Sequence, residues 1–224
     1  MKKYYVAIPI TAAIIVSAYF LYPQEDRSNQ PTLQVSTENK PTQLTLQTLA
    51  ENGSPLLGNP NAKITIIEWG DYQCTYCHAF HQNTKDQLIQ QYVETGKANF
   101  VFRDFPLNGA DSVLAAEASY CANDQGKYWQ YHDELYYNWG GERTGWVNQK
   151  SLDQFATNIS LDVTQFDKCV NTRKYEQKVL DNQRFGEDIG INGTPSFIIF
   201  SDKKVTKILG AQPFSVFKQT LDSI

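Results

Sequence analysis

The feature that most constrains the fold is a pair of cysteines placed where a strand gives way to a helix. Residues 63–69 read KITIIEW, a β-branched apolar run that is typical of a buried strand. After a short turn, Cys74 and Cys77 open a stretch whose apolar residues recur at helical spacing as far as residue 96. A strand that feeds a helix across a short turn predicts an α/β sheet protein.

The spacing of these cysteines also predicts redox chemistry. Cysteines at positions i and i+3 of a helix have Cβ atoms about 5–6 Å apart, slightly more than a disulfide needs, so a small adjustment of the first turn closes the bridge. The unpaired N–H groups and the dipole at a helix start favour the Cys74 thiolate and lower its pKa. We therefore expect Cys74 and Cys77 to switch between a dithiol and an oxidising disulfide.

Two other kinds of site would use the same cysteines. A zinc site needs four ligands, and no second closely spaced Cys or His pair accompanies this one. His78 completes C-x-x-C-H, the attachment signature of c-type haem, but the single Met is residue 1, so only His81 or His132 could be the second axial ligand. We expect no metal and no cofactor.

The rest of the chain adds strands on both sides of a long helical region. In order, the pattern predicts a strand at 99–105, helices from about 111 to 186 with an interruption near Gly140 and Gly141, strands at 196–200 and 204–209, and a last helix from Pro213. The order β-α-β, helices, β-β-α predicts an α/β fold with a large helical insertion at about 108–187.

The N-terminal region differs in composition from the body. Residues 1–23 begin with two lysines and continue as an uncharged, mostly apolar run about 30 Å long as a helix, which predicts a membrane anchor; cleavage as a signal after Ala18 is the alternative. The lysines place the N-terminus in the cytosol and the body outside, where disulfides persist. Residues 24–55 read as a flexible linker and 56–224 as the folded domain.

The charge balance bears on possible partners. The chain has 20 Lys and Arg against 24 Asp and Glu, a formal net charge of -4, and it has no basic run that could neutralise a row of phosphates. We expect no nucleic-acid partner.

Three segments carry a resemblance to a known family. GNPNAKITIIEWGDYQCTYC at 58–77, CANDQGKYWQYHDELY at 121–136 and GINGTPSFIIF at 190–200 resemble the DsbA family of thioredoxin-fold disulfide oxidoreductases, especially its membrane-tethered, BdbD-like members. The resemblance covers residues 56–224 and implies a thioredoxin fold with a helical insertion. This sequence departs from the family at Thr75, where Pro is usual, and at Tyr76, where the most oxidising members carry His.

The resemblance implies roles for further residues. Glu68, on the strand before the cysteines, would exchange a proton with Cys77, its pKa raised by burial; a strand-end Glu facing solvent is the alternative. Thr194-Pro195, with a cis bond as in the family, would present backbone groups beside Cys74 to an extended substrate. Thr75 and Tyr76 would tune the thiolate.

Cys121 and Cys169 remain once the first pair is assigned. They lie on separate predicted helices of the insertion, and we expect a structural disulfide that stabilises the fold by about 4 kcal/mol. A second redox pair that relays electrons to the first is the alternative, although two isolated cysteines lack a helix-start setting.

These observations favour an extracytoplasmic, membrane-tethered enzyme that introduces disulfides into exported proteins with free thiols, with a membrane redox partner for its reoxidation. One alternative is a reductase or isomerase of the same fold, from which the redox potential would distinguish it. The other is a tethered binding module or chaperone that uses the aromatic cluster at residues 128–139, although we expect most of that cluster to be core.

Overall fold

The computed structural model describes residues 45–224, so the expected anchor and most of the expected linker lie outside the described residues. Within the described part of the chain, no helix is both long and apolar enough to cross a bilayer.

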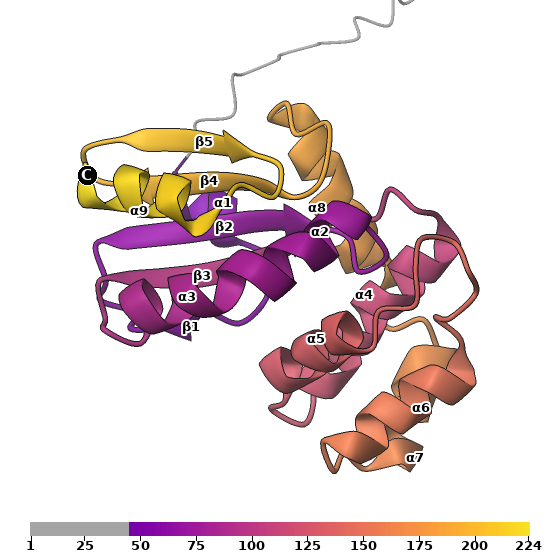
Figure 1. The fold of residues 1–224 in the computed structure, drawn as a ribbon. Helices are drawn as coiled ribbons and strands as arrows, with labels where there is room; N and C mark the ends of the chain where they lie inside the picture. Colours follow the sequence, from indigo (N-terminus) through magenta and orange to yellow (C-terminus); the bar gives the residue numbers. More distant parts are fainter. Residues whose placement is uncertain (1–44) are drawn as a thin grey trace, which may run out of the picture. The chain divides into compact units, whose positions relative to one another are not determined.

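A mixed sheet forms the centre of the folded body (Figure 1). Across the described residues its strand order is β1-β3-β2-β4-β5. β2 and β3 are parallel, whereas β1 pairs with β3, β4 with β2 and β5 with β4 in antiparallel fashion. The strands are β1 (Leu57–Gly58), β2 (Ile64–Gly70), β3 (Ala98–Asp104), β4 (Ser196–Ser201) and β5 (Val205–Leu209).

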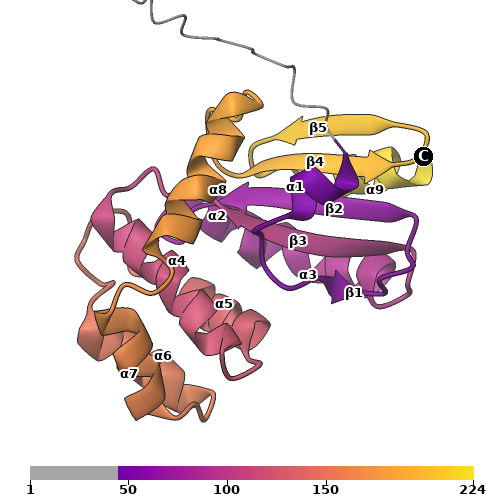
Figure 2. The same cartoon turned by 180° about the vertical axis from the view of Figure 1, so that it is seen from behind.

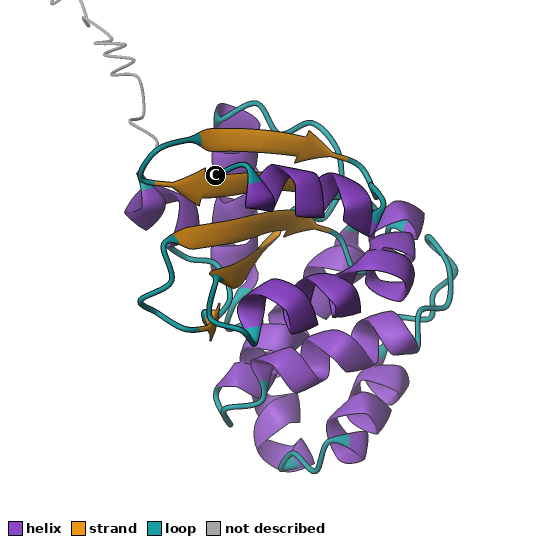
Figure 3. Cartoon of the chain, turned by 60° about the vertical axis from the view of Figure 1, so that its left-hand side comes forward, coloured by secondary structure: helices purple, strands orange, loops and turns teal. Residues whose placement is uncertain are grey.

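Helices cover both faces of this sheet (Figure 3). A continuous helical rod and the C-terminal helix lie on one face, and α1 and α8 lie on the other, as the two opposite views show (Figures 1 and 2). The rod comprises α2 (Thr75–Phe80), η2 (His81–Lys85), α3 (Asp86–Leu88) and η3 (Ile89–Val93); the other helices are α9 (Phe214–Asp222), α1 (Leu46–Ala50) and α8 (Glu176–Asp188).

The alternation of side chains along β2 divides the core between these faces. Ile66 packs in the cluster that contains Phe80 and Phe217 from the rod and α9. Ile67 and Trp69 pack on the opposite face with Leu49 of α1. Because successive strand residues point to opposite sides, Glu68 shares the face of Ile66, beneath the helix that carries the cysteines.

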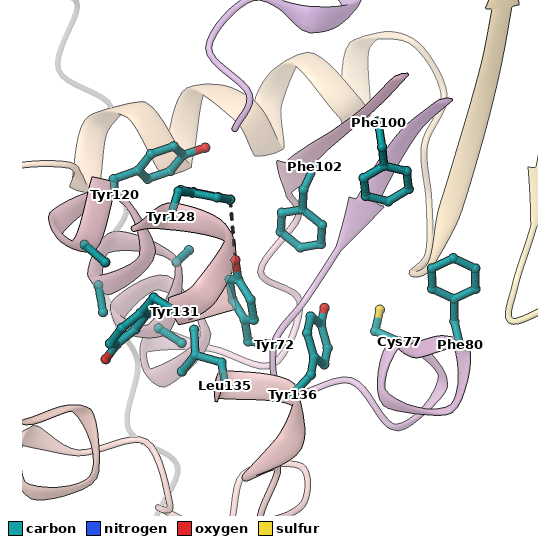
Figure 4. Close-up of a cluster of buried hydrophobic side chains, with 14 of the residues drawn as sticks. Tyr72, Cys77, Phe80, Phe100, Phe102, Tyr120, Tyr128, Tyr131, Leu135 and Tyr136 are labelled. Carbon is teal, nitrogen blue, oxygen red and sulfur yellow. Dashed lines mark hydrogen bonds between the residues drawn. The ribbon is translucent and has the colours of Figure 1, made fainter. Parts of the chain in front are cut away.

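The helical insertion between β3 and β4 contributes a second layer of core packing. It comprises α4 (Ala110–Asn123), α5 (Tyr128–Tyr137), α6 (Gln149–Asn158), α7 (Val163–Asn171) and α8. Tyr128, Tyr131 and Tyr136 of α5 are buried, and Figure 4 shows them with Tyr72 in one cluster. This part of the aromatic cluster is core, as expected, whereas Tyr137 is 65% exposed.

A disulfide joins Cys121 of α4 to Cys169 of α7, with 5.7 Å between the Cα atoms. The two residues thus tie together two helices of the insertion.

The folded body begins earlier than the expected boundary at residue 56. Thr45 caps α1 by accepting the N–H of Thr48, and Leu49 is fully buried against the sheet. Arg103 of β3 donates from Nη1 to the carbonyl of Leu49 at 2.9 Å. A short polar segment that supplies one well-placed leucine and a satisfied helix end can join a core, so residues 45–55 belong to the body rather than to a free linker.

Candidate active site

The two cysteines lie in different environments at the start of one helix. Cys74 is the N-cap residue of α2, with extended backbone, and Cys77 lies one turn further on, inside the helix. Both are free thiols, and Cys74 keeps 6% of its surface exposed whereas Cys77 keeps none. The intervening Thr75 and Tyr76 are exposed, with Tyr76 at 67%. A reagent from solvent therefore meets Cys74 first.

The helix start stabilises the Cys74 thiolate. A hydrogen bond from the Cys77 thiol, opposed by partial burial and helped by Thr194 and the first-turn N–H groups of Cys77 and Tyr76, lowers the pKa of Cys74 to about 6. The pKa of the Cys77 thiol is raised well above its ordinary value, chiefly by burial and also by the negative charges of Cys74 and Glu68. At neutral pH the reduced pair thus holds one thiolate and one thiol.

The turn before Cys74 is held by Asp71. Its carboxylate accepts the backbone N–H of Gln73 at 2.8 Å and that of Asn108 at 2.8 Å. The backbone N–H of Asp71 in turn points at the Cys77 sulfur, 3.5 Å away. These bonds order the strand-to-helix turn, since a short polar side chain can satisfy several turn N–H groups at once.

Glu68 lies wholly inside the protein on the cysteine side of the sheet. It is 0% exposed, and neither carboxyl oxygen has a hydrogen-bond partner among the described residues. Burial, reinforced by the negative charge at Cys74 and opposed by Lys85, raises the pKa of Glu68 to about 8. The solvent-facing alternative is therefore wrong, and Glu68 is a protonated buried acid near neutral pH.

The loop before β4 lies beside the exposed cysteine. The Thr194-Pro195 peptide bond is cis, and the Cys74 sulfur lies 3.5 Å from the carbonyl oxygen of Thr194. Pro195 also accepts the N–H of Gly210 through its carbonyl at 2.8 Å, which fixes this loop to the end of β5. The structure thus brings Cys74, Cys77, Glu68, Thr194 and Pro195 together, whereas the Cys121–Cys169 disulfide joins two other helices, α4 and α7.

A segment of the insertion contacts the same turn, and the sequence pattern does not reveal it. Trp139 stacks on His78 with ring centroids 4.5 Å apart, and its indole N–H donates to the Gln73 carbonyl at 3.0 Å. The Glu142 carboxylate accepts the N–H of Thr75 at 2.8 Å. The only sequence signal in this region is the glycine pair at 140 and 141, which marks a break between helices and says nothing of what the loop contacts.

One buried cluster carries possible metal ligands. His81, His132 and Asp133 offer donor atoms that all lie within 4.8 Å of one another. The Lys85 ammonium already forms an ion pair with Asp133, and Tyr72 bonds His132 Nδ1 at 2.9 Å. The cluster is therefore a buried polar network in which Lys85 pairs with the carboxylate, while the Nε2 atoms of His81 and His132 have no hydrogen-bond partner among the described residues.

Comparison with known proteins agrees with the fold and the site. The sequence model of the family described as Thioredoxin matches residues 50–222. "Probable disulfide bond formation protein D" of Bacillus anthracis is 26% identical over 147 residues, which cover 64% of this chain and 68% of that protein. The chain belongs to the thioredoxin family.

Two solved structures are similar in fold. The alpha-DsbA1 protein of Wolbachia pipientis superposes with a TM-score of 0.68 and 27% identity over 77% of this chain and 90% of that one. Oxidised BdbD from Bacillus subtilis has a TM-score of 0.67 and 23% identity over 75% of this chain and 91% of that one. Together with the relatives these confirm the predicted fold class, and the chain is a DsbA-like protein disulfide oxidoreductase.

Proposed function

We propose that this enzyme donates a Cys74–Cys77 disulfide to proteins that fold outside the cytoplasm, tethered to the membrane by residues 1–23 with residues from 24 onward as a linker. The observation that carries the direction of the reaction is the pKa of about 6 for the Cys74 thiol. Whatever stabilises the thiolate stabilises the reduced form, so the pair readily gives up its disulfide.

The asymmetry of the pair defines the order of events. A substrate thiolate attacks Cys74, the more exposed sulfur, and the electrons of the broken S–S bond pass to Cys77. A second substrate thiolate then attacks the substrate sulfur of the mixed disulfide and releases Cys74 as a thiolate. The substrate leaves with one new disulfide, and the enzyme holds the two electrons as a reduced pair.

Glu68 serves the step in which Cys77 changes charge. The Cys77 sulfur is fully buried, so a thiolate formed there is unfavourable until it receives a proton. A protonated Glu68 on the same face of the sheet supplies that proton during reduction and recovers it when Cys77 attacks in the reverse direction. Thr194 and Pro195 would bind the substrate backbone near the reacting sulfur, and the contact of Thr194 with Cys74 supports this role.

Reoxidation completes the cycle. The reduced pair must transfer two electrons to an acceptor, and we assign this role to a membrane-bound redox partner, which a tethered enzyme would meet in the plane of the bilayer. A reductase needs a pair that is stable as a disulfide, and the lowered pKa of Cys74 argues against that balance. An isomerase also uses a Cys74 thiolate, and it differs from the proposed oxidase in needing a partner that keeps the pair reduced.

Variants of the two cysteines test this function. With a reduced, unfolded protein as substrate, Cys74→Ser should abolish disulfide formation, whereas Cys77→Ser should accumulate mixed disulfides with protein or glutathione that are visible by non-reducing electrophoresis and mass spectrometry. Cys121→Ser paired with Cys169→Ser is the matched control, since it removes the other two sulfurs and should keep turnover. Full turnover by Cys74→Ser would exclude the proposed reaction.

A further inference from the structure

The loop that follows α5 lies against the first turn of α2. In addition to the Trp139 contacts, the backbone N–H of Arg143 donates to the Gln73 side-chain carbonyl at 3.0 Å. Arg143 also donates from Nη2 to the Leu107 carbonyl at 3.3 Å. Contacts on both sides of position 142 hold this part of the loop beside the cysteines, so Glu142 is placed by its neighbours.

The Glu142 carboxylate accepts a hydrogen bond from one of the backbone N–H groups that have no partner within the helix at its start. This group is the N–H of Thr75, at 2.8 Å, and Thr75 is the residue directly after Cys74. The next two N–H groups of the turn, those of Tyr76 and Cys77, contribute to the lowered pKa of the Cys74 thiol. The first turn of α2 is therefore shared between a fixed carboxylate and a thiolate that exists only when the pair is reduced.

We propose that Glu142 sets the redox balance of the Cys74–Cys77 pair by holding a negative charge on the N–H of Thr75, the residue directly after the sulfur that becomes a thiolate on reduction. The repulsion acts on the reduced form and is absent from the disulfide, so Glu142 makes the enzyme a weaker oxidant than the helix start alone would. Among the described residues no basic side chain pairs with Glu142 and cancels its charge. Glu142 is thus a positioning residue that acts through Cys74.

This inference deepens the proposed function, because it concerns the same cysteine pair. The equilibrium that tests it is the reaction of the protein disulfide with two glutathione thiols, which yields two protein thiols and one glutathione disulfide. That measurement needs no protein substrate. A chain that fails to oxidise exported proteins would contradict the proposed function and still report the effect of Glu142 on its own pair.

The experiment compares three variants by this equilibrium constant and by the thiolate absorbance of Cys74 against pH. Glu142→Gln keeps an acceptor for the Thr75 N–H and removes the charge, so the constant should shift about two- to fivefold toward the reduced protein, the range expected for one charge at a helix start. Glu142→Lys should shift it further in the same direction. Glu94→Gln, at the opposite end of the same helical rod, is the matched control and should leave it unchanged.

The same equilibrium measured at high salt concentration distinguishes an effect of the Glu142 charge from an effect of its structural contact. At about 1 M salt, exposed charges are screened within about 3 Å, so the difference between the parent chain and Glu142→Gln should shrink, while a purely structural contact would keep its effect. An unchanged constant in Glu142→Gln, a shift of Glu142→Lys toward the disulfide, or an equal response to Glu94→Gln would overturn the proposal.

Discussion

Lowering the pH from 7 to 5 should make the Cys74–Cys77 disulfide about tenfold harder for glutathione to reduce. The perturbation acts on the Cys74 thiol, whose pKa is lowered to about 6 from an ordinary value of 9.0 by the Cys77 thiol, Thr194 and the first-turn N–H groups. Only the reduced protein contains this thiol, so its titration changes the stability of the reduced form and leaves the disulfide form untouched.

The magnitude follows from the population of the thiolate. Deprotonation stabilises the reduced protein by a factor of one plus the ratio of thiolate to thiol, which is about 11 at pH 7 and about 1.1 at pH 5 for a pKa of about 6. The ratio of these factors is about tenfold, equivalent to about 1.4 kcal/mol or 30 mV for a two-electron couple. Glutathione, with an ordinary thiol pKa of about 8.5, stays protonated across this range.

The sign is fixed by the direction of the shift. A thiol whose pKa is lowered in the folded protein stabilises the reduced form. This stabilisation is complete above the thiol's ordinary pKa and is lost as the pH falls through the lowered pKa. The reduced protein should therefore be favoured progressively as the pH rises through 6. Below about pH 5 the constant should level off, because Cys74 is then protonated.

The assay equilibrates the protein with glutathione buffers at several pH values and quantifies the reduced fraction by alkylation and mass spectrometry. Thiolate absorbance of the reduced protein, measured in parallel, should show a step near pH 6 that is missing from Cys74→Ser. An equilibrium constant that stays flat between pH 5 and 7, with no absorbance step below pH 8, would refute the reasoning.

Three further outcomes are expected. Glu68→Gln should raise the free energy of unfolding by about 3 kcal/mol at pH 7 and by almost nothing at pH 4. The reason is that a carboxyl whose pKa is raised to about 8 in the folded protein destabilises the fold at any pH where the same carboxyl is ionised in the unfolded chain. Equal effects at both pH values in urea titrations would contradict this. Cys121→Ser with Cys169→Ser should lower the free energy of unfolding by about 4 kcal/mol, and a change of more than about twofold in the glutathione equilibrium of the other pair would instead indicate coupling. Tyr76→His should shift the glutathione equilibrium toward the reduced protein by up to about tenfold, because it adds a cation or hydrogen-bond donor near Cys74. A shift toward the disulfide accompanied by a lowered Cys74 pKa would show that thiolate electrostatics do not set the redox balance of the pair.

The strands of the sheet could be predicted closely because their β-branched and aromatic runs are typical of strands that are buried on both faces. The run at 63–69 became β2 at Ile64–Gly70, and the run at 99–105 became β3 at Ala98–Asp104. Both strands are covered on two faces, so β-branched and aromatic residues fill nearly every position. Because apolar residues occupy both faces of the strand, the sequence does not show which face Glu68 lies on. The structure shows this, since Ile66, on the same face as Glu68, belongs to the buried cluster that contains Phe80.

Elements and contacts that depend on tertiary packing could not be predicted from the sequence pattern. The α1 helix is five residues long, and its only fully buried side chain is Leu49, so neither length nor periodicity marks it. The contact of Glu142 with Thr75 joins positions 67 residues apart and requires knowledge of how the loop after α5 meets α2. A charged residue in a glycine-containing loop has no pattern that distinguishes such a contact from simple exposure.

The chemistry of the site follows from a single turn of helix that spans two environments. At its outer end Cys74 is within reach of solvent and of unpaired N–H groups, which favour a thiolate, whereas one turn further in Cys77 is enclosed by the sheet and favours a thiol. Burial that disfavours a charge on Cys77 also keeps Glu68 protonated, so the acid that can supply the proton lies in the same environment that makes the proton necessary. Replacing Glu68 by a smaller apolar residue would leave Cys77 in that environment without a proton donor, and attack on Cys74 would then have to expel a buried anion.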